Sequence, residues 1–256
     1  MTAGDRTRPL WEQDPTGRFS SRARDYARAR PDYPREAVAG ILDGLGVASA
    51  LAADVGAGTG IASRLLAEAG ASVLAIEPNA AMRAAFTSHP RVVLHEGTAE
   101  ATGLPDAHVD VVVCAQSFHW FEPVTALREF RRILRPGGRL ALVWNERDDR
   151  DRFTGGYSTL VRRAVGGDPT EARREGLAER LVAAGFSEIR EMAFAHRQGL
   201  TAHDLVARAD SASYVPRGGP AREELVAALH ELHERFADPD GRAWLVYRTL
   251  LHRATR

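Results

Sequence analysis

A glycine-rich turn is the first candidate for a binding site in this sequence. The segment Asp54-Val-Gly-Ala-Gly-Thr-Gly60 follows a short apolar run and precedes a segment with helical spacing. Glycines allow the backbone to turn sharply and to approach a ligand that side chains would exclude. The spacing of Gly56, Gly58 and Gly60 is G-x-G-x-G, whereas the dinucleotide fingerprint is G-x-G-x-x-G. The turn therefore predicts a ligand-binding loop that differs from that fingerprint.

Two further polar positions follow the next apolar runs. Glu77 stands 17 residues after Gly60, where a carboxylate can accept hydrogen bonds from both hydroxyls of a ribose. The alternative is a solvent-exposed acid before Pro78. The later loop Glu96-Gly-Thr-Ala-Glu100 could meet an adenine ring, or it could be an ordinary polar loop. Together the turn and Glu77 predict a nucleoside ligand.

The apolar runs alternate with helical patterns, which predicts a parallel sheet built from βαβ units. Strands are expected at residues 51–55, 72–76, 91–95, 109–115, 139–144 and 186–195, and residues 244–252 could form a seventh strand or a short helix. Helices are expected at 61–69, 123–134 and 170–184, ending at Gly70, at the turn 135–138 and at Gly185. The glycine turn and the later loops then share one edge of the sheet.

One α/β domain is expected, because 256 residues with 44 % hydrophobic content can bury a full core. Residues 49–145 are predicted to form the cofactor-binding core, and residues 146–256 the C-terminal part. Residues 1–48 and about 200–241 are helical by pattern and supply no strand. We expect them to form a lid and a substrate-side wall, since segments added to such cores commonly cover the carboxyl ends of the strands.

The composition narrows the class of partner and the expected location. Lys plus Arg and Asp plus Glu both total 34, so no net field favours nucleic acid or an anionic membrane, and a small molecule is the expected partner. No apolar stretch approaches the roughly 18 residues that span a bilayer, and the start lacks a signal peptide, so the cytoplasm is expected. Cys114 lies in an apolar run and is expected in the core. The many alanines and arginines suggest a GC-rich bacterial genome.

The chain resembles the class I S-adenosylmethionine-dependent methyltransferases, and within them the methyltransferase type 11 group. The resemblance covers roughly residues 19–145 well and the rest only in outline. It depends on Asp54-Val-Gly-Ala-Gly-Thr-Gly60, Glu77, Gly97-Thr-Ala-Glu-Ala-Thr-Gly-Leu-Pro105, Ala115-Gln-Ser-Phe-His-Trp120 and Leu134-Arg-Pro-Gly-Gly138.

This resemblance implies a Rossmann-like, seven-stranded, mostly parallel sheet with an antiparallel last strand and helices on both faces. It places the glycine loop under the methionine part of S-adenosylmethionine, Glu77 on the ribose, the loop after the third strand near the adenine, and Gln116 near the methionine part. The expected cofactor residues from the core are Asp54, Gly56, Ala57, Gly58, Gly60, Glu77, Pro78, Thr98, Ala99, Glu100, Gln116 and Ser117.

A narrower resemblance concerns the N-terminal segment. Phe19-Ser-Ser-Arg-Ala-Arg-Asp-Tyr26, Arg30-Pro-Asp-Tyr-Pro34 and Ser117-Phe-His-Trp120 are similar to trans-aconitate methyltransferase-like proteins. The resemblance implies that Tyr26 and Arg30 close over the amino-acid end of the cofactor, where Arg offers a bidentate fork to a carboxylate. The alternative is a solvated amphipathic helix.

The expected acceptor side includes Tyr33, His119, Trp120 and Trp144. His119 follows the fourth strand, at the edge where the methyl group should project. It could remove a proton from a hydroxyl or amine nucleophile, because its ordinary pKa is near neutrality, or it could shape the pocket or bond to the lid. No metal is expected: His230 and His233 have no third ligand nearby in sequence, and Asp148, Asp149 and Asp151 alternate with arginines in a predicted solvated loop.

Three functions remain open at this point. The main hypothesis is methyl transfer to O, N or C of a small metabolite, and bacterial secondary metabolism is one setting in which this reaction could occur. A nicotinamide-dependent oxidoreductase would explain the turn and Glu77 but predicts the other glycine spacing. A protein that binds S-adenosylmethionine without methylating is the third, because every motif concerns the cofactor. A nucleic-acid methyltransferase is disfavoured, since no basic appended domain or base-flipping motif is present. The acceptor and the oligomeric state are not predicted.

Overall fold

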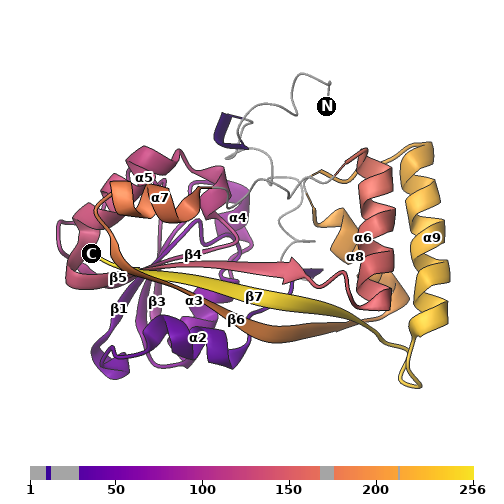
Figure 1. Cartoon of the computed structure of the whole chain (residues 1–256), viewed down its shortest axis with the longest axis horizontal. Helices are drawn as coiled ribbons and strands as arrows, with labels where there is room; N and C mark the ends of the chain where they lie inside the picture. The colour runs from indigo at the N-terminus through magenta and orange to yellow at the C-terminus, as the bar shows by residue number, and fades with distance from the viewer. Residues whose placement is uncertain (1–9, 13–28, 168–175, 213) are drawn as a thin grey trace.

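The structure is a computed structural model, and it describes residues 10–12, 29–167, 176–212 and 214–256 of the chain. Within these residues one seven-stranded sheet has the order β3-β2-β1-β4-β5-β7-β6 (Figure 1). β7 is antiparallel to both of its neighbours, and the other pairs are parallel. The strands are β1 Leu51–Val55, β2 Ser72–Ile76, β3 Val92–His95, β4 Val109–Ala115, β5 Leu134–Arg147, β6 Ser187–Leu200 and β7 Ala243–Thr255. The predicted Rossmann-like sheet with an antiparallel last strand is confirmed.

Helices cover both faces of the sheet. α2 (Arg35–Leu42) and α3 (Ile61–Glu68) pack on one face, and α5 (Pro123–Ile133) and α7 (Leu177–Ala183) pack on the other. Successive residues of a strand point to opposite faces. Val111 and Val113 of β4 therefore pack on the face covered by α2 and α3, while Val112 and Cys114 pack on the face covered by α5 and α7. Both faces are buried, which explains why the central strands are continuous apolar runs. Cys114 is fully buried in the core, as expected.

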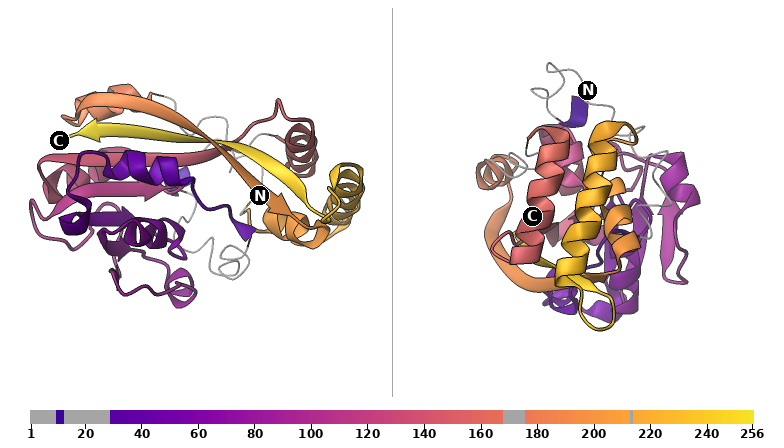
Figure 2. Two further views of the ribbon diagram at one scale, coloured as in Figure 1. Left: turned by 90° about the horizontal axis from the view of Figure 1, so that it is seen from below. Right: turned by 90° about the vertical axis from the view of Figure 1, so that its right-hand side faces the viewer.

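Three helices form a separate cluster beyond the ends of the long strands. They are α6 (Arg152–Val165), α8 (Ala202–Asp210) and α9 (Pro220–Phe236), packed around buried residues such as Tyr157, Leu205 and Leu229. Figure 2 shows β6 and β7 as a twisted ribbon that runs from the sheet to this cluster. α6 directly follows β5, so the cluster lies at the carboxyl end of β5. The insertion expected at about 200–241 is therefore helical and on the predicted side of the sheet.

Several predicted boundaries differ from the structure. β5 is longer than expected at both ends. Residues 135–138, expected as a turn, belong to the strand, where Leu134 pairs with Val109 of β4, and the other end continues along β7 to Arg147. β6 is extended by its antiparallel ladder with β7, and residues 244–252 belong to a strand. The sequence missed α6, and Asp151 caps its start by accepting a hydrogen bond from the Thr154 backbone N–H. From the expected lid, residues 35–42 form α2 and pack on the sheet face, because Val38, Ile41 and Leu42 are buried there. Residues 35–42 of the expected lid are therefore part of the core.

The remaining short elements lie near the carboxyl edge or at the opposite end of the sheet. α4 (Ala80–Ala84) follows β2, and the 3-10 turn η4 (Phe118–Trp120) follows β4. η2 (Leu10–Glu12) lies against η4, and η3 (Val47–Ser49) precedes β1. The loops after β1, β2, β3 and β4 meet at one edge, which is where the predicted site residues should gather.

Candidate functional site

A pocket of about 290 Å³ lies at the carboxyl ends of β1, β2, β3 and β4. Its walls come from the residues that directly follow each strand, so the parallel order of the sheet assembles it. Most of the predicted cofactor residues line this pocket: Gly56, Gly58, Glu77, Pro78, Thr98, Ala99, Glu100, Gln116 and Ser117, together with Trp120 from the expected acceptor side.

The pocket also has walls that the sequence reasoning missed. Trp11, Asn79, Met82, Phe121 and Glu122 line it. Asn79 accepts a hydrogen bond from the Met82 N–H and so caps α4, a pattern readable as Asn before a short helix. Trp11 belongs to the segment expected to be a lid, but nothing in its sequence neighbourhood marked it.

Glu77 holds two parts of the pocket together. Its carboxylate accepts hydrogen bonds from the Gly58 N–H at 2.8 Å and from the Asn79 N–H at 2.9 Å. The side chain is only 7 % exposed, and burial raises the pKa of this carboxyl although both hydrogen bonds oppose the rise. Glu77 therefore fixes the glycine loop against the end of β2 and presents a carboxylate to the pocket. The alternative of a solvent-exposed acid before Pro78 does not hold.

Gly56 leaves room for the residue that follows β4. Ser117 donates a hydrogen bond from Oγ to the Val55 carbonyl at 2.7 Å, so its Cβ lies directly against the loop. A Cβ added to Gly56 would lie 2.6 Å from the Ser117 Cβ and 2.9 Å from the Phe121 ring. Gly56 also has a φ of 70°, in the left-handed region. Only glycine satisfies both constraints at this position.

Asp54 lies beneath the loop and does not line the pocket. Its Oδ2 accepts a hydrogen bond from the Ser63 hydroxyl at 2.5 Å, while its buried Oδ1 has no hydrogen-bond partner among the described residues. Burial raises the pKa of Asp54 to about 6, and the nearby Glu77 carboxylate adds to the rise. An ionised Glu77 in the pocket wall, with an ionised Asp54 beneath the loop, favours a positively charged ligand over an anionic one.

The stability of the protein should depend on the charge of Asp54. Because its pKa is raised from 3.8 to about 6, the folded protein retains a proton that the unfolded chain has released, and stability falls as the pH rises between these values. We expect Asp54→Asn to stabilise the protein by up to roughly 3 kcal/mol at a pH of about 7.5, and to have little effect near pH 4. Urea unfolding at both pH values measures this difference, and an equal change at both would rule out ionisation of Asp54 as its cause.

The loop after β3 forms the next wall. Glu100 accepts a hydrogen bond from the Glu122 N–H at 2.9 Å, which ties this loop to the start of α5. Thr98 accepts one from the Ala101 N–H, and Ala99 is buried against the core. These contacts hold the loop in place as a wall of the pocket with both polar and apolar groups.

Of the expected acceptor residues, Trp120 lines the wall after β4, whereas His119 and Trp144 do not line the pocket. Gln116 has a φ of 57° and donates from Nε2 to the Asn145 carbonyl at 3.0 Å, which links the pocket to the end of β5. His119 is next to Trp120, and its Nδ1 accepts a hydrogen bond of 3.4 Å from the Trp144 Nε1–H. Trp144 is buried in the core and packs edge-on against His252. Trp144 therefore helps to fix the orientation of the His119 ring.

Other predicted residues lie away from this pocket. Ala57 and Gly60 belong to the loop but do not line the pocket, and Gly60 packs against Phe86. Arg30 donates from Nη2 to the Ser211 carbonyl at 3.1 Å and so contacts the helical cluster. Tyr33 is buried in the cluster around α2. Tyr26 lies outside the described residues, and its role stays a prediction.

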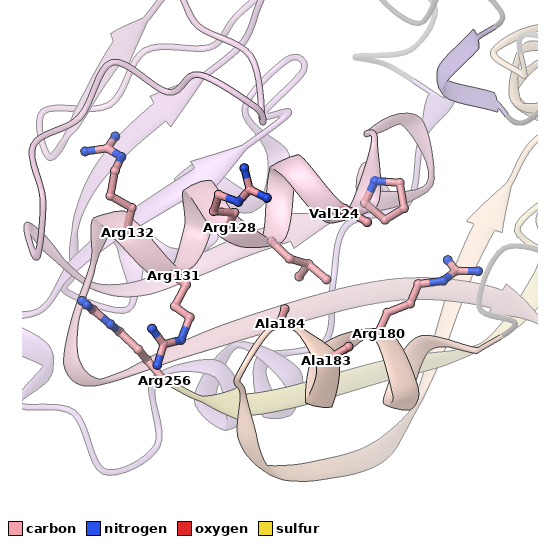
Figure 3. A pocket seen from close by; sticks show the side chains of 10 residues that line it. Val124, Arg128, Arg131, Arg132, Arg180, Ala183, Ala184 and Arg256 are labelled. Atoms are coloured by element: carbon pink, nitrogen blue, oxygen red, sulfur yellow. The ribbon is translucent and has the colours of Figure 1, made fainter.

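A larger groove of about 480 Å³ lies between α5 and α7 (Figure 3). It contains none of the predicted site residues. Arg128, Arg131 and Arg180 are exposed at its rim, where water can solvate the guanidinium groups. We therefore assign the functional site to the pocket at the strand ends, which brings together loops from four strands.

Two searches of the described residues concern other kinds of site. No group of three or more His, Cys, Asp or Glu side chains in these residues could hold a metal ion. Asp148 pairs with Arg150 from the alternating segment, and Asp149 pairs with Arg162 of α6. None of the helices in the described residues is long and apolar enough to cross a membrane.

Comparison with known proteins gives the family. Residues 53–142 match the family described as "Methyltransferase domain". An uncharacterized methyltransferase of Schizosaccharomyces pombe is 32 % identical over 218 residues, 84 % of this chain and 86 % of that protein. The mycobacterial methyltransferase Rv3342 is 38 % identical over 159 residues, and this match covers 60 % of the chain but only 62 % of the relative. Relatives thus occur in bacteria and in eukaryotes.

Solved structures support the fold. A structure from Anaeromyxobacter dehalogenans, assigned to the type II methyltransferases, has a TM-score of 0.60 at 24 % identity and covers 89 % of this chain and 96 % of its own. The [4+2]-cyclase SpnF has a TM-score of 0.51 at 23 % identity and covers 89 % and 83 %. The sheet order, the pocket at the strand ends and the relatives agree, and the chain belongs to the class I S-adenosylmethionine-dependent methyltransferases, in the methyltransferase-domain family.

Proposed function

We propose that the protein transfers the methyl group of S-adenosylmethionine to an O, N or C atom of a small molecule. The observation that carries this proposal is Glu77, a buried carboxylate that faces the pocket while it holds the Gly58 loop. An adenosine whose ribose lies on Glu77 would have its base near the Thr98–Glu100 loop and its amino-acid part over the glycine turn. The acidic Glu77 in the pocket wall supports the same ligand, since S-adenosylmethionine carries a sulfonium and an ammonium group against one carboxylate and is positive overall.

The chemistry needs little from the protein beyond position. The cofactor supplies an electrophilic methyl carbon; the acceptor's electron pair forms the new bond to that carbon as the carbon–sulfur bond breaks and its electrons pass to sulfur. Displacement of this kind depends chiefly on holding the two reactants in line. Gln116 and Trp120 line the pocket after β4, and His119 lies beside them. These residues would form the wall between the cofactor and the acceptor.

A nicotinamide cofactor fits this pocket less well. The Gly58 N–H, which such a loop would offer to a pyrophosphate, already donates to Glu77. A pyrophosphate at the loop would also lie against the acidic side chain of Glu77. The G-x-G-x-G spacing agrees with this reading.

A protein that binds S-adenosylmethionine without methylating remains a second candidate. The similarity to a [4+2]-cyclase means that the fold does not by itself decide the reaction. Calorimetry with S-adenosylmethionine, its demethylated product and NAD should give binding of the first two only. Incubation with methyl-labelled cofactor and a panel of small acids, phenols and amines should then transfer label to one class. Tight NAD binding without a response to S-adenosylmethionine would refute the proposal, and cofactor binding with no transfer to any acceptor would favour the second candidate.

His119 should position the acceptor rather than take its proton. Because Nδ1 accepts from Trp144, a neutral His119 carries its proton on Nε2, so Nε2 can donate a hydrogen bond but cannot act as a base. We expect His119→Gln to lower turnover by less than about tenfold and to raise mainly the Michaelis constant of the acceptor. The pH profile should keep its shape. A loss of roughly 10² in turnover, with the disappearance of an acidic limb near pH 6 to 7, would instead identify a general base.

A further inference from the structure

The helical cluster contains a buried arginine without an acidic partner. Arg208 of α8 is 6 % exposed, and its contacts are with neutral groups: Nε donates to the Tyr247 hydroxyl at 3.3 Å, and Nη1 donates to the Ser211 hydroxyl at 3.5 Å. Among the described residues no carboxylate pairs with it, and the nearby Asp210 pairs with Arg222 instead. Buried charges in proteins are ordinarily paired, because an isolated one costs several kcal/mol. Burying the unpaired charge of Arg208 therefore does not stabilise the fold, and another role should explain it.

A second arginine contacts another buried tyrosine of the same helical cluster. Arg147 is at the carboxyl end of β5, opposite Tyr247 in the register, and its guanidinium lies 5.3 Å from the centre of the Tyr157 ring. Burial raises the pKa of Tyr157, while the positive charges of both Arg208 and Arg147 act to lower it. Within the described part of the chain, neither arginine forms an ion pair. The two guanidinium groups thus contact two buried tyrosines of one cluster, Arg208 at Tyr247 and Arg147 at Tyr157.

Arg147 lies beyond the pocket residue Gln116, at the carboxyl end of β5. Gln116 lines the pocket and bonds to the Asn145 carbonyl, and Arg147 is two residues further along the same strand. At about 3.4 Å per residue, that is about 7 Å beyond Asn145, roughly the length of a small metabolite. α6, which carries Tyr157, and α8, which carries Arg208, lie beside this end of β5 (Figure 1).

We propose that Arg147 and Arg208 bind an oxyanion, a carboxylate or a phosphate, carried by the methyl acceptor. The proposal rests on the proposed function and narrows its acceptor to an anionic molecule whose charged group is remote from the methylated atom. Guanidinium groups bind such oxyanions with short, charge-assisted and often bidentate hydrogen bonds. The anion would supply the partner that Arg208 lacks.

A purely structural role for Arg208 predicts the opposite effect on stability. If its hydrogen bonds to Tyr247 and Ser211 serve the fold, Arg208→Met should destabilise the protein. If Arg208 serves a ligand, replacing an unpaired buried charge by an apolar side chain of similar length should leave the unfolding midpoint unchanged or raise it. Urea unfolding without added anions separates the two readings.

The binding test uses succinate and inorganic phosphate as probes, each titrated by calorimetry with and without saturating S-adenosylhomocysteine. We expect one of them to bind the wild-type protein, and Arg208→Met and Arg147→Gln each to weaken it by at least about tenfold. Arg128→Gln, an exposed arginine in the groove between α5 and α7, is the matched control and should bind like the wild type. The probe that binds distinguishes a carboxylate from a phosphate ligand.

The proposal is overturned if neither probe binds the wild-type protein, or if Arg208→Met and Arg147→Gln bind it as the wild type does. Should Arg208→Met fail to fold, Arg147→Gln and Arg208→Lys decide the question, and both should weaken binding. Affinity for S-adenosylmethionine is measured on the same variants and should not change. A wild-type protein that binds an oxyanion but not S-adenosylmethionine would refute the proposed function and leave the anion site standing.

Discussion

Glu77→Ala should weaken the binding of S-adenosylmethionine by at least about tenfold, because a carboxylate that accepts hydrogen bonds from both ribose hydroxyls contributes about 1.5 to 3 kcal/mol per bond. The variant should still fold. The Gly56 and Ala57 N–H groups donate to the Ile76 carbonyl at 2.9 and 3.1 Å, so the glycine loop stays attached to β2 without the Glu77 side chain. Calorimetry gives the affinity, and thermal unfolding gives the stability.

Glu96→Ala provides the matched control for this change. Glu96 follows β3 as Glu77 follows β2, but its side chain is 74 % exposed and forms an ion pair with Arg83 outside the pocket. Exposed ion pairs contribute little, so Glu96→Ala should retain both affinity and stability. If Glu77→Ala folds and binds the cofactor as tightly as the wild type, the ribose is bound elsewhere and the assignment of this pocket is wrong.

The sequence predicted the sheet and most of the pocket because both depend on local patterns. Buried parallel strands are apolar runs, and the residues that directly follow them lie at one edge whatever the details of packing. Glu77 could be assigned in this way from its position after β2 alone. Its hydrogen bond to the Gly58 N–H could not, because that contact depends on how β1 and β2 are aligned in the sheet.

Features that depend on contacts between distant segments were not predictable. Gly155 and Gly156 weaken the helical pattern of α6, and the structure explains both: a Cβ on Gly155 would lie 2.6 Å from the Asp149 carbonyl, and one on Gly156 would lie 2.9 Å from Leu232 of α9. The bond from Trp144 to His119, which decides the ring's tautomer, joins residues 25 positions apart. The pairing that extends β5 to Arg147 likewise needs β7, about a hundred residues later in the chain.

Gly56→Ala should have the second large effect, on stability and on cofactor binding together. The added methyl group would lie 2.6 Å from the Ser117 Cβ, and neither atom can rotate away because each is attached directly to the backbone. The left-handed φ of 70° adds a cost of about 1 to 2 kcal/mol for any residue with a Cβ. Relief requires the glycine loop and the Ser117 segment to separate, and both line the pocket. We therefore expect Gly56→Ala to lower the free energy of unfolding by more than the left-handed φ alone would cost. Its affinity for S-adenosylmethionine should fall by at least about tenfold.

Gly103→Ala separates backbone strain from the clash. Gly103 has a φ of 75°, close to that of Gly56, but a Cβ there would meet nothing within 4 Å. Gly103→Ala should lower the free energy of unfolding only by the roughly 1 to 2 kcal/mol that a left-handed φ costs, and it should keep its cofactor affinity. The double variant Gly56→Ala with Ser117→Gly lacks the contact with the Ser117 Cβ but keeps the 2.9 Å contact with Phe121. Its loss of stability should therefore be smaller than the sum of the losses in the two single variants. Urea unfolding and calorimetry on the four proteins of this cycle measure the coupling. Equal losses in Gly56→Ala and Gly103→Ala, with no coupling to Ser117, would mean that the loop tolerates the methyl group and that the close approach of Ser117 does not shape the pocket.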